Sequence, residues 1–183
     1  DGLDGSLARV FKVGEVLPYM NGKTIDYVID FATYAIIPAY FFYEAHLVAE
    51  AWRLPCTALI LLVSALYYGK EGMVTDDLYF LGFPVLWNMV VFYLLFVFPF
   101  GSTGNIMMVI FFAVLHFVPV KFVYPSQGRR FRRLSIAITI VFIATLAAIL
   151  WFYPVRHWWL TLLAYLTAGY YASMAIYNTW IED

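Results

Sequence analysis

Charged residues are scarce in this sequence, and cysteine is almost absent. Asp, Glu, Lys and Arg make up 13% of the 183 residues, whereas soluble domains usually carry about 25%. The formal net charge of −1 lacks the basic surplus that is typical of nucleic-acid binding. The single cysteine, Cys56, builds neither a disulfide framework nor a cysteine metal cluster. These shortages argue against a soluble, a nucleic-acid-binding or a disulfide-stabilised protein.

Apolar residues dominate instead. They make up 64% of the chain, and the mean hydropathy is +0.80. A helix needs roughly 20 mostly apolar residues to cross a bilayer, and by that measure six spans are predicted, at residues 24–49, 54–70, 78–100, 104–124, 134–154 and 157–180. Helices are expected because lipid satisfies no backbone hydrogen bonds. We therefore predict an all-α, polytopic integral membrane helical bundle, with one domain over residues 1–183 and six spans after the end of a preceding helix.

The basic residues predict the orientation of these spans. When the spans are threaded alternately, nine of the eleven Lys and Arg residues fall on one side. These nine are Arg9, Lys12, Lys23, Lys70, Lys121, Arg129, Arg130, Arg132 and Arg133. Only Arg53 and Arg156 fall on the other side. Because cytoplasmic loops carry the excess of Lys and Arg, the first side is expected to face the cytoplasm.

Four acidic residues gather near the start of the chain. Asp1 and Asp4 are three residues apart, and Asp26 and Asp30 are four apart, so each pair lies on one face of a helix. Asp30 leads directly into apolar sequence, where a carboxylate costs up to about 2.5–3.5 kcal/mol at the bilayer centre and less near its surface. Divalent cations, which prefer carboxylate and phosphate oxygens, would offset the mutual repulsion of four acids. The alternative is a cluster of helix-capping and surface charges.

Read together, these residues form the pattern D-x2-D-G-x2-A-R, then twelve residues, then G-x3-D-x3-D. Its fixed positions are Asp1, Asp4, Gly5, Ala8, Arg9, Gly22, Asp26 and Asp30. The pattern resembles the signature of the CDP-alcohol phosphatidyltransferase family. The gap of twelve residues is longer than in many members. The length of this gap is similar to that in bacterial members that use choline. The segment GMVTDDLYFLGFPVLWNM also resembles those members.

The resemblance implies a reaction and a set of roles. Members of the family transfer a phosphatidyl group from CDP-diacylglycerol to an alcohol and release CMP, which would make this chain a bacterial inner-membrane enzyme with a cytoplasmic active site. Asp1, Asp4, Asp26 and Asp30 would hold magnesium or manganese, with Asp30 also deprotonating the alcohol. Gly5, Ala8, Arg9 and Gly22 would lie against the cytidine diphosphate. The family pattern also implies one full span, and most of the helix that carries Asp1, upstream of residue 1. The intact protein would then have eight spans, and a homodimer is one option.

Choline carries a quaternary ammonium group, which proteins hold with aromatic faces and carboxylates. Tyr79, Phe83 and Trp87 recur at four-residue spacing on the predicted third span, which suggests one helix face near the cytoplasmic side. Nearby acids and tyrosines on the same side are Glu71, Asp76, Asp77, Tyr67 and Tyr68. The alternative for such a stripe is a lipid-facing or core role. His116 is expected to form a hydrogen bond between helices, and Asn88 to line the site or bridge two helices.

Two other functions stay open at this point. The acceptor could be another alcohol, such as serine, glycerol phosphate or an inositol phosphate. For a phosphorylated acceptor, the basic run GRRFRR would supply phosphate contacts. The acids could also form an ion or proton pathway in a transporter. A transporter should place ionisable groups at several depths, whereas the middles of spans two to six contain almost none. The sequence therefore favours the enzyme.

Overall fold

The computed structural model of the chain describes residues 7, 10–16, 19–70, 79–98, 100–122 and 132–181. The helices in this part are α2 (Val13–Val16), α3 (Gly22–Phe31), α4 (Ile37–Glu44), α5 (Glu50–Tyr68), α6 (Trp87–Phe92), α7 (Ser102–Leu115), α8 (Arg132–Phe152) and α9 (Trp158–Trp180). Two π-helical segments, η1 (Ala32–Ile36) and η2 (Tyr93–Val97), continue α3 and α6. The predicted helical membrane bundle is confirmed, with a small two-stranded sheet as an addition.

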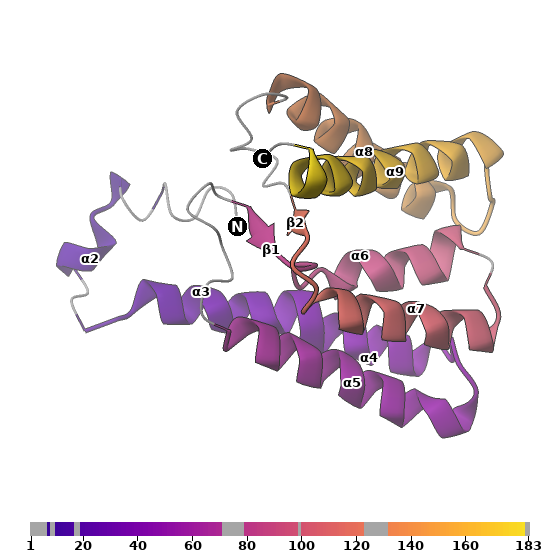
Figure 1. Ribbon diagram of the computed structural model, residues 1–183, viewed down its shortest axis with the longest axis horizontal. Coiled ribbons are helices and arrows are strands. Elements are labelled where there is room, and N and C mark those ends of the chain that lie inside the picture. Colours follow the sequence, from indigo (N-terminus) through magenta and orange to yellow (C-terminus); the bar gives the residue numbers. More distant parts are fainter. Residues whose placement is uncertain are drawn as a thin grey trace.

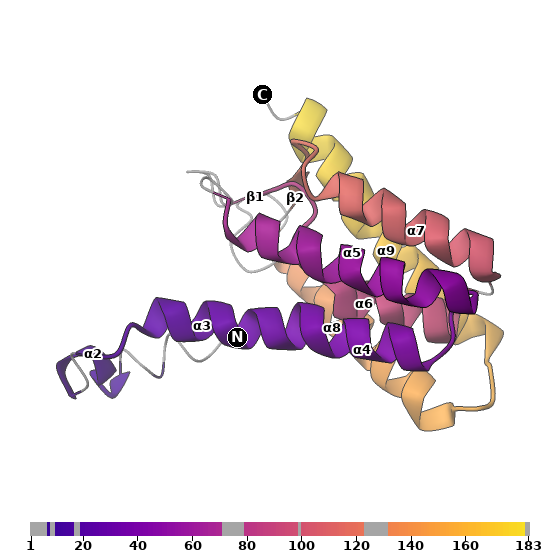
Figure 2. The same cartoon turned by 90° about the horizontal axis from the view of Figure 1, so that it is seen from below.

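The first span is one continuous helix from Gly22 to Glu44, built from α3, η1 and α4 (Figures 1 and 2). It begins where the side-chain oxygen of Asn21 accepts a hydrogen bond from the Thr24 amide at 3.2 Å, as is typical of an asparagine that caps a helix N-terminus. Pro38 lies near the start of α4. Because its ring crowds the carbonyl four residues earlier and it has no N–H, the wider π-helical turn before it keeps the helix unbroken.

Within the described ranges, three helices are long and apolar enough to cross a membrane: Gly22–Glu44, Glu50–Tyr68 and Arg133–Phe152. They agree with the predicted first, second and fifth spans. The predicted sixth span corresponds to α9, which has 23 residues. The predicted third and fourth spans were too long, because their helical parts are Trp87–Val97 and Ser102–Leu115.

Extended chain replaces the missing helical turns of those two spans. Strand β1 (Phe80–Leu81) pairs antiparallel with β2 (Lys121–Phe122), so that Phe80 lies opposite Phe122. Gly82 follows β1 with a φ of +91°, a conformation that side chains rarely adopt, and its amide donates to the Val120 carbonyl at 2.9 Å. Pro84 and Pro119, which cannot donate a backbone hydrogen bond, interrupt helix formation on either side. The segment 79–86 is thereby fastened to the end of α7.

The core joins α4, α5, α6 and α7. Its central side chains include Phe42, Ile60, Trp87 and Val109, all fully buried. Helices α8 and α9 form a separate pair that lies over α6 in Figure 1. A second apolar cluster around Tyr93, Val97 and Ala164 attaches this pair. The Tyr93 hydroxyl also donates to the Ala164 carbonyl at 2.8 Å.

The two ends of the bundle differ. We call one the sheet end: it holds β1, β2, the last turn of α5 and the first turns of α3. The other, the loop end, holds the connections from α4 to α5 and from α8 to α9 (Figures 1 and 2). Among the described residues, Lys23, Lys70 and Lys121 belong to the sheet end, and Arg53 and Arg156 to the loop end. This distribution agrees with the predicted alternate threading.

Candidate functional site

The carboxylates of Asp26 and Asp30 lie on the protein-facing side of α3. Both residues are half-buried, together with Tyr27, Phe31 and Tyr34, which follow the same helical stripe. The opposite side of α3 is apolar and exposed, with exposed fractions of 42% for Ile25, 64% for Val28 and 56% for Ile29. Acids turned inward and apolar residues turned outward are typical of a membrane helix that carries a functional polar site.

The end of α5 contacts this acidic stripe. The ring of Tyr68 lies 5.9 Å from that of Tyr27 and 6.1 Å from that of Phe31, measured between ring centroids. The carboxylates of Asp30 and Asp26 both act electrostatically on the Tyr68 phenol, Asp30 more strongly. Tyr68 therefore brings a phenol from a second helix to the side of α3 that carries the predicted catalytic carboxylate. The sequence predicted Tyr68 on the same side as the acids, but nothing in it indicated contact with α3.

The start of α3 leaves room beside the acids. No described heavy atom lies within 4 Å of the position that a Cβ would take at Gly22. The packing of the described protein therefore does not require glycine there, and a need for close approach by a bound molecule would explain it. The ammonium of the next residue, Lys23, lies 5.6 Å from the centre of the Tyr27 ring. Gly22, Asp26 and Asp30 share one helix as predicted.

Much of the predicted site falls outside the described residues. This applies to Asp1, Asp4, Gly5, Ala8, Arg9, Glu71, Asp76 and Asp77. Within the described ranges, no group of three or more His, Cys, Asp or Glu side chains forms a metal centre. Asp26 and Asp30 are the two predicted metal ligands whose positions are known, and the complete ligand set stays a prediction.

The predicted aromatic stripe does not form a single helix face, so that part of the prediction was wrong. Tyr79 lies in extended chain, Phe83 in the turn after β1, and Trp87 at the first position of α6. Phe83 packs against Phe112, with ring centroids 4.6 Å apart. The indole of Trp87 is fully buried and stacks on His116 at 5.4 Å. A role for these residues in holding an acceptor stays a prediction.

Two polar residues differ from expectation in the partners they use. The Nδ1 atom of His116 lies 2.7 Å from the Phe112 carbonyl, within its own helix rather than across to another. The His116 ring nevertheless contacts aromatic rings from α5 and α6. The side-chain oxygen of Asn88 accepts a hydrogen bond from the adjacent Met89 amide at 2.9 Å. This bond is local and does not join two helices.

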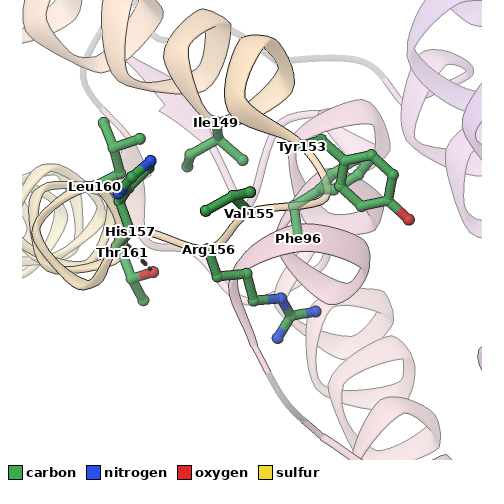
Figure 3. A pocket seen from close by; sticks show the side chains of 8 residues that line it. All are labelled: Phe96, Ile149, Tyr153, Val155, Arg156, His157, Leu160 and Thr161. Carbon is green, nitrogen blue, oxygen red and sulfur yellow. Dashed lines mark hydrogen bonds between the residues drawn. The ribbon is translucent and has the colours of Figure 1, made fainter.

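A small cavity lies at the loop end, where α8 turns into α9 (Figure 3). It is lined by side chains that include Phe96, Ile149, Val155 and Leu160, and its volume is about 20 Å³. This space holds roughly one water molecule, which is far too little for a nucleotide or a lipid headgroup. It also lies at the opposite end of the bundle from Asp26 and Asp30, so it is not part of the candidate site.

The chain is similar in sequence to several known proteins. Phosphatidylcholine synthases of Rhizobium johnstonii and Rhizobium meliloti are both 41% identical to it, over 138 and 141 residues, covering 57% and 58% of those proteins. The phosphatidylcholine synthase of Agrobacterium fabrum is 36% identical over 172 residues, which are 93% of this chain and 70% of the relative. The chain belongs to the phosphatidylcholine synthase family.

This membership confirms the resemblance that the spacing of the acids suggested. The chain spans little more than half the length of the two Rhizobium phosphatidylcholine synthases. No family model matches the chain, and no solved structure matches it.

Proposed function

We propose that the protein transfers a phosphatidyl group from CDP-diacylglycerol to choline, giving phosphatidylcholine and CMP. The observation that carries the proposal is the inward-facing carboxylate pair of Asp26 and Asp30 beside Tyr68, in a chain of the phosphatidylcholine synthase family. Carboxylates at a membrane helix are costly unless they serve a charged partner. A diphosphate with its counter-ion is such a partner, and the proposed donor carries one.

The described acids suit a divalent cation. Asp26 and Asp30 lie one turn apart on one half-buried helix face, and carboxylate oxygens are the ligands that magnesium and manganese prefer. In the proposal Asp1 and Asp4 complete the ligand set, while Gly5, Ala8, Arg9 and Gly22 lie against the cytidine diphosphate. When bound, the cation would neutralise charge on the diphosphate. The two located carboxylates are thus a partial but chemically fitting set of ligands.

Asp30 has a second role in the proposed reaction. Its carboxylate accepts the hydroxyl proton of choline as the choline oxygen forms a bond to the phosphorus that carries the diacylglycerol. The bond from that phosphorus to the bridging oxygen breaks, and CMP leaves with the electron pair. The proposal is a direct displacement, which needs positioning more than a covalent enzyme intermediate. Tyr68 orients the Asp30 carboxylate through its neighbouring hydroxyl.

The proposal also locates the reaction. The sheet end, with Lys23, Lys70 and Lys121, would face the cytoplasm of a bacterium by the excess of basic residues, and the enzyme would lie in the inner membrane. CDP-linked donors and soluble choline are available on that side. The outward apolar surface, such as Ile140 and Ile143 with exposed fractions of 63% and 60%, would contact lipid. A homodimer is compatible with this arrangement.

The test is a transfer assay on the full-length natural protein in membranes from a host without phosphatidylcholine. Labelled choline, CDP-diacylglycerol and either manganese or magnesium are supplied, and labelled phosphatidylcholine and CMP are measured. Both products should form together and vanish with EDTA. The Asp30→Asn variant should lose activity by about 10²–10⁴-fold, as expected for loss of a general base.

Glu44→Gln is the matched control, because it removes a carboxylate from the exposed far end of the same helix. It should retain the wild-type rate. CMP release with serine, glycerol phosphate or an inositol phosphate, but not with choline, would keep the donor chemistry and replace the acceptor. Failure to release CMP with any acceptor would contradict the enzyme proposal and favour an ion pathway through the acids.

A further inference from the structure

Three buried side chains at the sheet end each carry a polar atom without a hydrogen-bond partner among the described residues. These atoms are the Tyr67 hydroxyl, Trp87 Nε1 and His116 Nε2. The His116 ring contacts both of the others, at 5.5 Å from Tyr67 and 5.4 Å from Trp87, measured between ring centroids. All three side chains are at most 1% exposed. Buried polar atoms in native proteins nearly always have partners, so three in one cluster require a common explanation.

The chemistry of the three atoms is complementary. The Phe112 carbonyl can only accept, so His116 Nδ1 donates to it, and in the neutral ring Nε2 is left as an acceptor. Trp87 Nε1–H can only donate, and the Tyr67 hydroxyl can do either. A single water molecule offers two donors and two acceptors. It can accept from Trp87, donate to His116 and exchange a hydrogen bond with Tyr67.

We propose that an internal water molecule joins Tyr67, Trp87 and His116, and that His116 is thereby a positioning residue for the acceptor side of the active site. The inference rests on the proposed function. The cluster connects α5, α6 and the end of α7, three elements that are distant in the sequence. Internal waters of this kind typically make about three hydrogen bonds to otherwise unsatisfied groups.

The cluster has this positioning role because it lies between the acidic helix α3 and the segment that follows β1. Tyr67 faces His116, while the next residue, Tyr68, faces Tyr27 and Phe31 on the acidic helix α3. Holding Tyr67 therefore holds the Tyr68 ring in its place beside Asp30. On the other side, Phe83 packs on His116 at 5.5 Å, and its amide donates to the Leu115 carbonyl at 2.9 Å. The chain that leaves the predicted acceptor acids Asp76 and Asp77 is thus anchored on the same cluster.

The decisive variants are Tyr67→Phe and His116→Phe in the full-length protein. Each keeps an aromatic ring and removes polar atoms from the cluster. If a water joins the three residues, Tyr67→Phe breaks a buried hydrogen bond, and the Tm of the purified protein falls by about 2–4 °C. If the Tyr67 hydroxyl simply has no partner, its removal relieves a desolvation cost, and the Tm rises or stays unchanged. The sign of the shift separates the two cases.

Kinetics test the positioning role. Both variants should raise the KM for choline by about three- to tenfold, the equivalent of one lost hydrogen bond, and leave the KM for CDP-diacylglycerol unchanged. A merely structural role would lower the amount of active protein and move neither KM. Tyr40→Phe is the control, because Tyr40 is 61% exposed on the outer surface of α4. It should change neither Tm nor KM.

The effects of the two variants on Tm should also be less than additive in the double variant, since both break one network. A raised or unchanged Tm in Tyr67→Phe, additive effects, or an unchanged KM for choline would each overturn the proposal. Failure of the proposed function is seen separately, as a wild-type protein that incorporates no choline. In that case the sign of the Tm shift and the coupling still test whether the network exists.

Discussion

The ring of Tyr68 meets the ring of Phe31 edge to face, with their centroids 6.1 Å apart and an angle of 80° between the ring planes. Phe31 directly follows Asp30 on α3, and Tyr68 is the last residue of α5. This contact therefore places the end of one membrane helix beside the carboxylate of another. Among the described residues, two helices contribute to the candidate site, and its geometry depends on how the last turn of α5 is held.

Tyr68→Phe tests whether the hydroxyl in this contact matters. The variant keeps the ring packing but removes the hydroxyl that is proposed to orient the Asp30 carboxylate. If that hydroxyl donates to the carboxylate in the reacting complex, the hydrogen bond contributes about 1.5–3 kcal/mol, and kcat for choline transfer should fall by roughly tenfold or more. The Tm should stay within about 2 °C of the wild-type value. An unchanged kcat would show that Tyr68 only packs against α3.

Gly22→Ala tests for a bound molecule at the start of α3. The added Cβ meets no described heavy atom within 4 Å, so the Tm should not fall. If CDP-diacylglycerol lies against Gly22, crowding of about 1–3 kcal/mol should raise its KM by about fivefold or more. The KM for choline should change much less. Equal changes in both KM values, or none, would remove Gly22 from the proposed nucleotide site.

Gly82→Ala tests the attachment of segment 79–86 to α7. A Cβ at Gly82 would lie 2.1 Å from the His116 carbonyl oxygen, and the φ of +91° disfavours any side chain. We expect the Tm to fall by at least about 5 °C, because strain and a clash each cost more than about 1 kcal/mol. Gly169→Ala is the matched control, since its Cβ meets nothing within 4 Å in α9. There alanine should maintain or raise the Tm.

Asn105→Ala tests stability at the opposite end of the bundle. The Asn105 side-chain amide donates to the Leu47 carbonyl at 2.6 Å and so ties α7 to the connection between α4 and α5. Its loss leaves that carbonyl unpaired at a cost of about 1–3 kcal/mol, which corresponds to a Tm lower by roughly 3–10 °C. The KM values should not change, because the loop end is remote from the acids. A changed KM for choline with an unchanged Tm would contradict this assignment.

The helical spans could be predicted from the sequence because lipid imposes a simple rule. A run of apolar residues must satisfy its own backbone hydrogen bonds, so it becomes a helix. This rule located Gly22–Glu44, Glu50–Tyr68 and Arg133–Phe152 within a few residues. It failed at residues 79–86 and 116–122, where the composition is equally apolar. There the backbone hydrogen bonds are made by β1, β2 and the end of α7, which a local pattern does not reveal.

The candidate site, too, could be predicted from the sequence only in part. The one-turn spacing of Gly22, Asp26 and Asp30 follows from the helix alone, and the structure places all three on α3 as expected. The stripe of Tyr79, Phe83 and Trp87 rested on the assumption of one continuous helix, and it failed with that assumption. Tyr68 and His116 acquire their roles from residues far away in the sequence, so neither could be assigned to a partner in advance.

What the sequence determined by itself was the class of protein, the family and the helix that carries the located acids. Composition, hydropathy and carboxylate spacing can be read directly from the sequence. In a helix, residues three or four apart lie on the same face, so the spacing of the acids predicts their shared side. The tertiary structure alone decided that the acids face inward, that Tyr68 meets them and that His116 lies between Tyr67 and Trp87. These are contacts between helices, and they depend on how side chains of different spans fit together.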